Sequence, residues 1–450
     1  MRFCKSGKAG VSFRSKYRIQ VSGKGKKMLI VFNLKNDEYT EMEGKSEDPF
    51  LHVNYEPDRH RLVVASDFFG TAFTTYLALE EDKFYISDSL FKIQRMLRRK
   101  SELNTDMLPH FFYNGFLPGS HTLIKGIYKL PPKKRVIAED GAIRAEDYEM
   151  EFGDSCGEGR SLEKMYDEVM LQAVSTALPD TEKYNLALSG GFDSNCLLYL
   201  IKQLKREAET DCYSVGGSVG IDETKDAAAI AGMYENLSFH RTMVTSDTLK
   251  HLDEIVYRLE GSVYERGVFL QYELAKMLHE HGCTHLICGE CADQVFHVKS
   301  YGLASEDRFL FGYQDTPYEM ASYVVLKKSA VMLHSFGIRG IYPYLDEGVI
   351  RLGYTTRMEN GDNKEFHKSQ CKRLLPQAVF RNLKKIGGST ELLSLMDAGT
   401  DYEELCKTCR YYDPEFRYTE KYSKKEAVMD YYLSLKYIES FERQFCDHEE

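Results

Sequence analysis

Short alternating runs of apolar and polar residues fill the first third of the chain. Segments rich in β-branched and aromatic residues, separated by polar links of hairpin length, predict strands at 27–34, 51–56, 61–67, 71–79 and 83–88. A helical pattern follows near residue 90, and residues 130–143 return to a strand pattern around an Asp-Gly turn. This region predicts a β-rich α+β sandwich.

A longer period begins after residue 160. Helical spacing is evident at Leu162, Met165, Val169 and Ala173. Helical patterns then alternate with strand patterns at 184–188, 211–215, 239–244 and 284–288. That alternation is typical of a parallel sheet covered by helices, and the chain is mostly helical in pattern from residue 315 onward. The polar stretch 152–161 is the candidate linker, so we expect one domain at 1–153 and an α/β domain with a helical C-terminal part at 160–450.

The bulk composition excludes some classes of function. A net charge of −10 argues against general affinity for nucleic acid, which requires basic surface. No segment reaches the roughly 18 consecutive apolar residues of a membrane helix, and the N-terminus lacks the apolar core of a signal peptide. We therefore expect a cytoplasmic protein without a nucleic-acid or membrane partner, whose 11 cysteines stay reduced.

The turn after the first strand of the second region carries the candidate chemistry. It contains Ser189, Gly190, Gly191, Asp193 and Ser194. Glycines let a backbone approach an anion, and the free N–H groups at a helix start bind phosphate. An aspartate beside phosphates is sensible when a divalent cation is shared between them, as Mg²⁺ prefers. The turn therefore predicts a metal–nucleotide site; the alternative is an ordinary turn, since such clusters are common.

The same turn, "LSGGFDS", resembles the SGGxDS pyrophosphate loop of the N-type ATP pyrophosphatases, and specifically of the asparagine synthetase family. Further segments resemble that family in the same order: 212–216 with 222–231, 288–296, 337–346 and 372–388. In the N-terminal region, 66–76 and 115–132 resemble parts of the glutamine amidotransferase domain that precedes the synthetase domain in this family.

The resemblance implies an enzyme that adenylates a carboxylate with ATP, releases pyrophosphate and lets an amine attack the acyl-adenylate. It implies that Asp193 and Asp293 hold Mg²⁺ on the triphosphate, and that Glu290 lies near the attacking amine as its base. The implied nucleotide contacts are Ser189, Gly190, Gly191, Asp193, Ser194, Val215 and Gly289. Lys385 is favoured over Lys384 as the cation on the phosphates, because the family commonly places glycine two residues on; a solvated helix end is the alternative for either lysine.

The N-terminal region departs from the family. Active amidotransferase members carry cysteine directly after the initiator methionine, where this chain has Arg2, and nothing in residues 20–80 resembles their glutamine-clamping segments. We therefore expect no glutamine hydrolysis and an amine from another source. The family's β-lactam formers carry tyrosine in place of Glu290, which disfavours them.

The interpretation that we favour is a lasso-peptide cyclase, which joins a peptide's N-terminal amine to an Asp or Glu side chain. Its partners would be a peptide, a precursor-peptide peptidase and a leader-binding protein. An ammonia-dependent asparagine synthetase, a ligase acting on a small carboxylate and amine, and a catalytically inactive scaffold stay open.

Two C-x-x-C pairs, 288–291 and 406–409, suggest zinc as an alternative metal. Their separation is far longer than in zinc ribbons, and the first pair lies inside the segment that resembles the synthetases. We therefore expect no zinc site.

Overall fold

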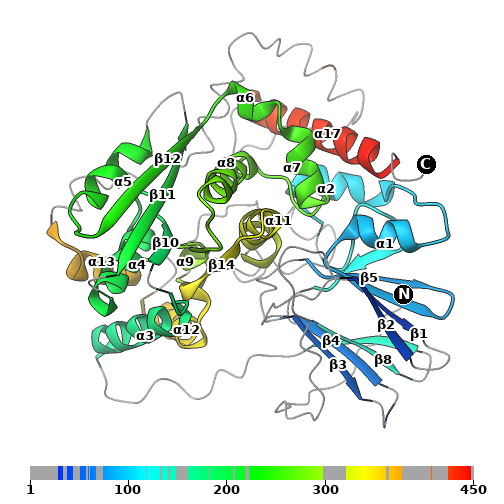
Figure 1. Ribbon diagram of the computed structural model, residues 1–450, viewed down its shortest axis with the longest axis horizontal. Helices are drawn as coiled ribbons and strands as arrows, with labels where there is room; N and C mark the ends of the chain where they lie inside the picture. Colours follow the sequence, from blue (N-terminus) through cyan, green and yellow to red (C-terminus); the bar gives the residue numbers. More distant parts are fainter. Residues whose placement is uncertain are drawn as a thin grey trace.

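In a computed structural model of the protein, the described residues form three β-sheets with helices packed between and around them (Figure 1). The structure describes residues 29–33, 38–43, 51–56, 59, 61–66, 74–117, 119–131, 134–139, 142–147, 161–181, 183–205, 208–217, 222–296, 321–360, 364–377, 407 and 424–446. The expected domain boundary between residues 153 and 160 lies outside these ranges and stays a prediction.

Two antiparallel sheets form the N-terminal part, with strand orders β2-β1-β6-β5-β7 and β3-β4-β8-β9. The strands are β1 (Leu29–Asn33), β2 (Glu38–Glu43), β3 (Leu51–Glu56), β4 (Arg61–Ser66), β5 (Tyr76–Glu80), β6 (Lys83–Ser87), β7 (Ile127–Lys129), β8 (Lys134–Glu139) and β9 (Ala142–Asp147). Buried side chains from both sheets, among them Phe32, Val64 and Phe84, form one apolar cluster, so the sheets pack face to face. Whether they make an amidotransferase-like domain stays a prediction.

A five-stranded parallel sheet, in the order β12-β11-β10-β13-β14, organises the second part. Its strands are β10 (Lys183–Ala187), β11 (Glu209–Gly217), β12 (Leu237–Val244), β13 (His285–Ile287) and β14 (Arg339–Ile341). The predicted parallel sheet is confirmed. The described elements after residue 315 are mostly helical, as expected, and β14 is the strand among them.

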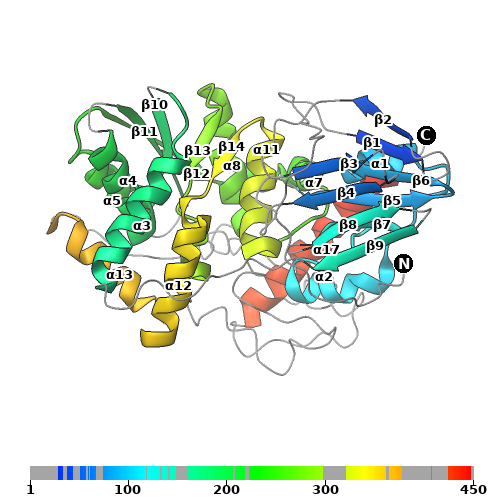
Figure 2. The ribbon, with the colours of Figure 1, turned by 90° about the horizontal axis from the view of Figure 1, so that it is seen from below.

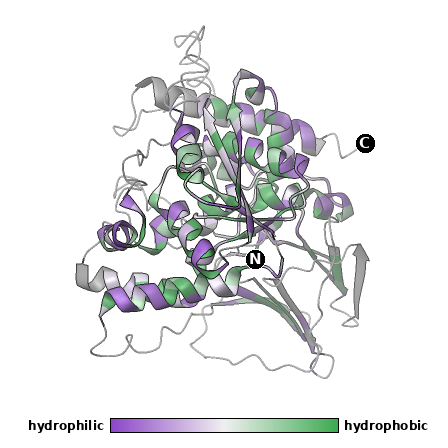
Figure 3. Ribbon diagram, turned by 60° about the vertical axis from the view of Figure 1, so that its left-hand side comes forward, coloured by the Kyte–Doolittle hydropathy of each residue, from purple (hydrophilic) through white to green (hydrophobic). Residues whose placement is uncertain are grey.

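Helices cover both faces of this sheet. α4 contacts β10 and α5 contacts β11 and β12 on one side, while α8 contacts β11 and β12 from the other (Figures 1 and 2). Figure 3 shows that helices of the protein carry both hydrophobic and hydrophilic residues, as expected of helices with one buried face. The helices of the N-terminal half are α1 (Leu90–Met96), the 3₁₀ turn η2 (Thr105–Met107), α2 (Leu108–Asn114), α3 (Leu162–Ala177), α4 (Phe192–Leu204) and α5 (Glu223–Ala231).

The remaining helices follow β12. They are α6 (Ser246–Leu249), α7 (Leu252–Leu259), α8 (Gly267–Glu280), α9 (Ala292–Val295), the π-helical η4 (Ala321–Val325) and η5 (Lys327–Val331), α11 (Met332–Ser335), the 3₁₀ turn η6 (Pro343–Leu345), α12 (Glu347–Asn360), α13 (Glu365–Leu374) and α17 (Lys424–Cys446). Within the described ranges, none of them combines the length and apolar character that crossing a bilayer requires.

The antiparallel and parallel parts share a continuous hydrophobic core. The Phe441 ring of α17 stacks on Phe91 of α1 at 5.6 Å between centroids. Glu260, which follows α7, accepts hydrogen bonds from the Ser89 hydroxyl at 2.6 Å and from the Leu90 N–H at 2.5 Å, at the start of α1. The carboxylate therefore caps a helix of the N-terminal part.

Candidate functional site

The glycine turn lies at the carboxyl end of β10 and leads into α4. Its conformation is fixed by hydrogen bonds within the turn. The Ser194 hydroxyl accepts from the Ser189 N–H and lies 3.1 Å from the Ser189 hydroxyl. The Asn195 side-chain amide donates to the carbonyl oxygens of Gly191 at 2.7 Å and Ser189 at 3.2 Å. Asn195 was not among the predicted site residues, because an asparagine inside a helical pattern gives no signal of its own.

The first turn of α4 begins at Gly191, which has no side chain with which to cap it. Its leading N–H groups therefore point out of the helix beside the exposed Ser189. Gly190 is buried in the same turn. This geometry suits an anion at the edge of the sheet.

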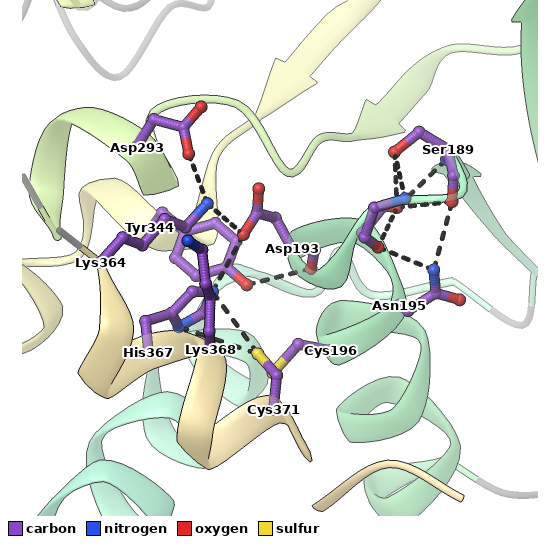
Figure 4. Close-up of polar contacts among 12 residues, drawn as sticks. Ser189, Asp193, Asn195, Cys196, Asp293, Tyr344, Lys364, His367, Lys368 and Cys371 are labelled. Carbon is purple, nitrogen blue, oxygen red and sulfur yellow. Dashed lines mark hydrogen bonds and ion pairs between the residues drawn. The ribbon is translucent and has the colours of Figure 1, made fainter. Parts of the chain in front are cut away.

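Two aspartates from distant segments meet beside this turn (Figure 4). Asp193 lies in the first turn of α4 and Asp293 in α9. Lys364, which precedes α13, lies between them, with its Nζ 2.6 Å from Asp193 Oδ1 and 2.5 Å from Asp293 Oδ1. The structure thus brings together the two carboxylates that were predicted to share a metal ion, and adds a lysine that was not predicted.

Asp193 and Lys364 shift each other's pKa values. Burial raises the pKa of the Asp193 carboxyl, but the Lys364 ammonium and the hydrogen bond from His367 outweigh it, so that the pKa lies well below its usual range. Burial lowers the pKa of the Lys364 ammonium, and the two aspartates more than reverse this, raising it. The Asp193 carboxylate is therefore held ionised beside a protonated lysine at neutral pH.

His367, on α13, contacts the Asp193 carboxylate. Its Nε2 lies 3.0 Å from Asp193 Oδ1 and its Nδ1 lies 2.8 Å from the Tyr166 hydroxyl. Burial lowers the pKa of this imidazole despite the neighbouring carboxylate. The Tyr344 hydroxyl also donates to the Asp193 carbonyl oxygen at 3.0 Å. None of these contacts could be expected from local sequence pattern.

The loop after β13 approaches the glycine turn closely because of Gly289. A Cβ atom at this position would lie 3.1 Å from the Ser194 nitrogen, so a side chain would be tightly packed against the start of α4. Cys291, in the same loop, has a positive φ of 71°. A non-glycine residue in this conformation stores strain of about 1 kcal/mol or more, and such strain often accompanies functional loops.

Glu290 lies in the same loop, half-buried, and accepts a hydrogen bond from the Gln271 side-chain amide of α8 at 3.1 Å. Nearby, Glu265 and Lys328 form an ion pair at 2.7 Å. Burial raises the Glu265 pKa, and Lys328 reverses the shift and keeps it below the usual range. The Gln271 amide therefore orients the Glu290 carboxylate.

The other predicted residues are placed less directly. Val215 is half-buried in the carboxyl-terminal half of β11, the strand beside β10. Lys384 and Lys385 lie outside the described residues, as do Cys406 and Cys409. Cys288 and Cys291 are buried, and burial raises the pKa of both thiols, as does the nearby Glu290.

The donor set around Asp193 fits Mg²⁺ shared with a triphosphate. In the part of the chain that the structure describes, no group of three or more His, Cys, Asp or Glu side chains is arranged to hold a metal ion. Two converging carboxylates are nevertheless the protein share that Mg²⁺ commonly takes, with phosphate and water oxygens completing its octahedron. The lowered pKa keeps the Asp193 carboxylate in the ionised form that a metal ligand needs.

Comparison with known proteins assigns part of this region. Residues 165–312 match the asparagine synthase family, and Asp193, Glu290 and Asp293 all lie inside the match. The match supports a relationship of this region to the asparagine synthase family. A Methanocaldococcus jannaschii protein named "Putative asparagine synthetase (glutamine-hydrolyzing) 2" is 20% identical over 236 residues, which are 50% of this chain and 46% of that protein. The chain thus spans about half the length of that relative.

Three solved structures show weak similarity. The U34-tRNA thiolase NcsA from Methanococcus maripaludis is 14% identical with a TM-score of 0.27, and the match covers 50% of this chain and 81% of that chain. An NH3-dependent NAD synthetase from Campylobacter jejuni is 14% identical with a TM-score of 0.23, and the match covers 54% of this chain and 98% of that chain. An NMN synthetase from Francisella tularensis is 12% identical with a TM-score of 0.24, and the match covers 50% of this chain and 98% of that chain. Similarity of this degree carries no argument about the reaction.

Proposed function

We propose that the protein is an ATP-dependent amide synthetase that converts a carboxylate into its adenylate, releases pyrophosphate and transfers the acyl group to an amine. The observation that carries this proposal is the convergence of Asp193 and Asp293 on Lys364 beside the glycine turn. Open parallel sheets bind ligands outside the carboxyl ends of their strands, which is where this cluster lies. The asparagine synthase match over residues 165–312 supports the same chemistry.

Each described residue has a defined task in this scheme. The N–H groups at the start of α4 would orient phosphate oxygens, and Asp193 and Asp293 would hold Mg²⁺. Bound Mg²⁺ would neutralise charge on the departing pyrophosphate. Lys364 adds a fixed positive charge at the same place. Glu290, oriented by Gln271, would take a proton from the attacking amine.

The amine, in our proposal, belongs to the substrate itself, as in the lasso-peptide cyclases. Its support is the sequence: residues 20–80 lack anything resembling the glutamine-clamping segments of active amidotransferases. The substrate would be a peptide whose N-terminal amine attacks an activated Asp or Glu side chain. A precursor-peptide peptidase and a leader-binding protein would be its partners.

The test supplies the full-length protein with ATP, MgCl₂ and one of two substrate sets, and measures AMP, pyrophosphate and product mass. The first set is a peptide with a free N-terminus and an internal Asp or Glu, and the second is aspartate with ammonium. We expect one AMP for each peptide that loses one water, and no product from the Asp193→Asn variant. Formation of asparagine from the second set would show that the protein is an asparagine synthetase and not a cyclase. No AMP and no pyrophosphate with either set would overturn the proposal in favour of an inactive scaffold.

A further inference from the structure

A buried histidine links the core of the protein to the Asp193 carboxylate. We propose that His367 is a positioning residue that fixes the Asp193 carboxylate for Mg²⁺·ATP, and that Tyr166 sets its tautomer. This inference rests on the nucleotide site proposed above.

The hydrogen-bond directions follow from the chemistry of the three groups. An ionised carboxylate only accepts hydrogen bonds, so His367 Nε2 must carry the proton that it donates to Asp193 Oδ1 at 3.0 Å. In a neutral imidazole Nδ1 is then the acceptor, and the Tyr166 hydroxyl, 2.8 Å away, is its donor. The Cys196 and Cys371 sulfurs lie farther from that hydroxyl, at 3.5 and 3.8 Å.

Aromatic rings hold the imidazole in this plane. The His367 side chain is 0% exposed. Phe296 stacks on it at 4.5 Å between centroids with an interplanar angle of 9°, and Tyr344 meets it edge-on at 5.4 Å. The ring therefore cannot turn without disturbing the core, and its N–H keeps one direction.

The consequence falls on the two oxygens of Asp193. Among the described residues, both polar contacts of its carboxylate, from His367 and from Lys364, go to Oδ1. That arrangement commits Oδ1 to the protein and leaves Oδ2 for a ligand at the turn. Partners that orient a metal-binding side chain in this way typically change metal affinity by about 10–100-fold when they are removed.

The experiment measures Mg²⁺·ATP dissociation constants by titration calorimetry for the wild-type protein and for three variants. His367→Leu removes the donor but keeps an apolar side chain among the aromatic rings. His367→Gln retains an N–H near the position of Nε2, and Tyr166→Phe removes only the hydroxyl. We expect His367→Leu to weaken binding by about tenfold or more, and His367→Gln to restore most of that loss. Tyr166→Phe should fall between the two.

A second readout does not depend on the nucleotide. Nitrogen NMR of ¹⁵N-histidine-labelled protein resolves the 13 histidines, and the pair that disappears in His367→Gln is assigned to His367. That pair should be of the Nε2–H tautomer, and Tyr166→Phe should shift or broaden it. It also serves if His367→Leu fails to fold. Equal Mg²⁺·ATP affinity in the wild type and in His367→Leu would overturn this inference alone, as would a His367→Gln variant as weak as His367→Leu. An Nδ1–H tautomer in the wild type would overturn it as well. A wild-type protein that binds no Mg²⁺·ATP would overturn the proposed function together with it.

Discussion

Removing the charge of Lys364 should destabilise the ligand-free protein, because its ammonium separates two buried carboxylates. Its side chain is 4% exposed, against 17% for Asp193 and 23% for Asp293. Since one nitrogen contacts both oxygens, at 2.6 and 2.5 Å, those oxygens lie at most about 5 Å apart. Two unit charges at that distance repel by about 3 kcal/mol at an effective dielectric constant of about 20.

We therefore expect Lys364→Met to lower the free energy of unfolding by about 3–5 kcal/mol at pH 7, the usual cost of removing one partner from a buried ion pair. The protein contains no tryptophan, so urea unfolding is best followed by circular dichroism. Lys368→Met, on the helix that Lys364 precedes, is the matched control. Lys368 pairs with Glu365 at 3.0 Å, but the two side chains are 37% and 67% exposed, so its loss should cost less than about 1 kcal/mol.

The pH dependence tests the electrostatic origin. In the wild type the lowered pKa of Asp193 contributes stability that is present above about pH 4 and is lost as pH falls through the folded-state pKa. In Lys364→Met, repulsion between the two carboxylates should raise the pKa of one of them. That carboxylate becomes protonated as pH falls, and the repulsion that destabilises the variant is then lost. The difference in the free energy of unfolding between the wild type and Lys364→Met should therefore decrease from pH 7 to about pH 4. Mg²⁺ should also stabilise the variant more than the wild type. A loss no larger than that of Lys368→Met, or a difference independent of pH, would refute this reasoning.

Three further predictions concern the reaction and the core. Asp193→Asn and Asp293→Asn should each abolish ATP-dependent pyrophosphate release by removing Mg²⁺ ligands, and near-normal release from either would count against the site. Glu290→Gln should spare ATP–pyrophosphate exchange more than amide formation; equal loss of both would show that its role as base is wrong. Glu260→Ala should destabilise the protein by about 2–4 kcal/mol in urea, because it leaves the Ser89 hydroxyl and the Leu90 N–H without their acceptor, and a change below about 1 kcal/mol would contradict that account.

The sequence predicted the elements that carry long, uniform patterns. The runs at 184–188, 211–215 and 239–244 became β10, β11 and β12, because alternation of buried strands with helices leaves a strong signal. β2, β7 and β14 were missed. β7 and β14 have three residues each, as has β13, which was predicted at 284–288; the place of β7 and β14 in a sheet depends on partners distant in the sequence rather than on a local period.

The site divides in the same way. Asp193, Glu290 and Asp293 lie in segments whose order and spacing resemble a known family, so they could be chosen in advance. Lys364 and His367 could not, because each acts through a contact with a residue far away in the chain: His367 and Asp193 are 174 positions apart. Lys364 also has a φ of 58°, a conformation that its residue type does not favour.

The charges of the cluster indicate that binding a triphosphate requires positive charge beyond the residues that were predicted from the sequence. Asp193 and Asp293 carry two negative charges in a largely buried site, and a triphosphate would bring several more. Lys364 offsets one of the two, and the buried His367 stays neutral, so it donates a hydrogen bond without adding charge. A polyanion can therefore enter only with its own cation and with further positive charge from the protein. The segment containing Lys384 and Lys385 is the candidate source of that charge in the sequence, and the catalytic role of one of these lysines stays a prediction.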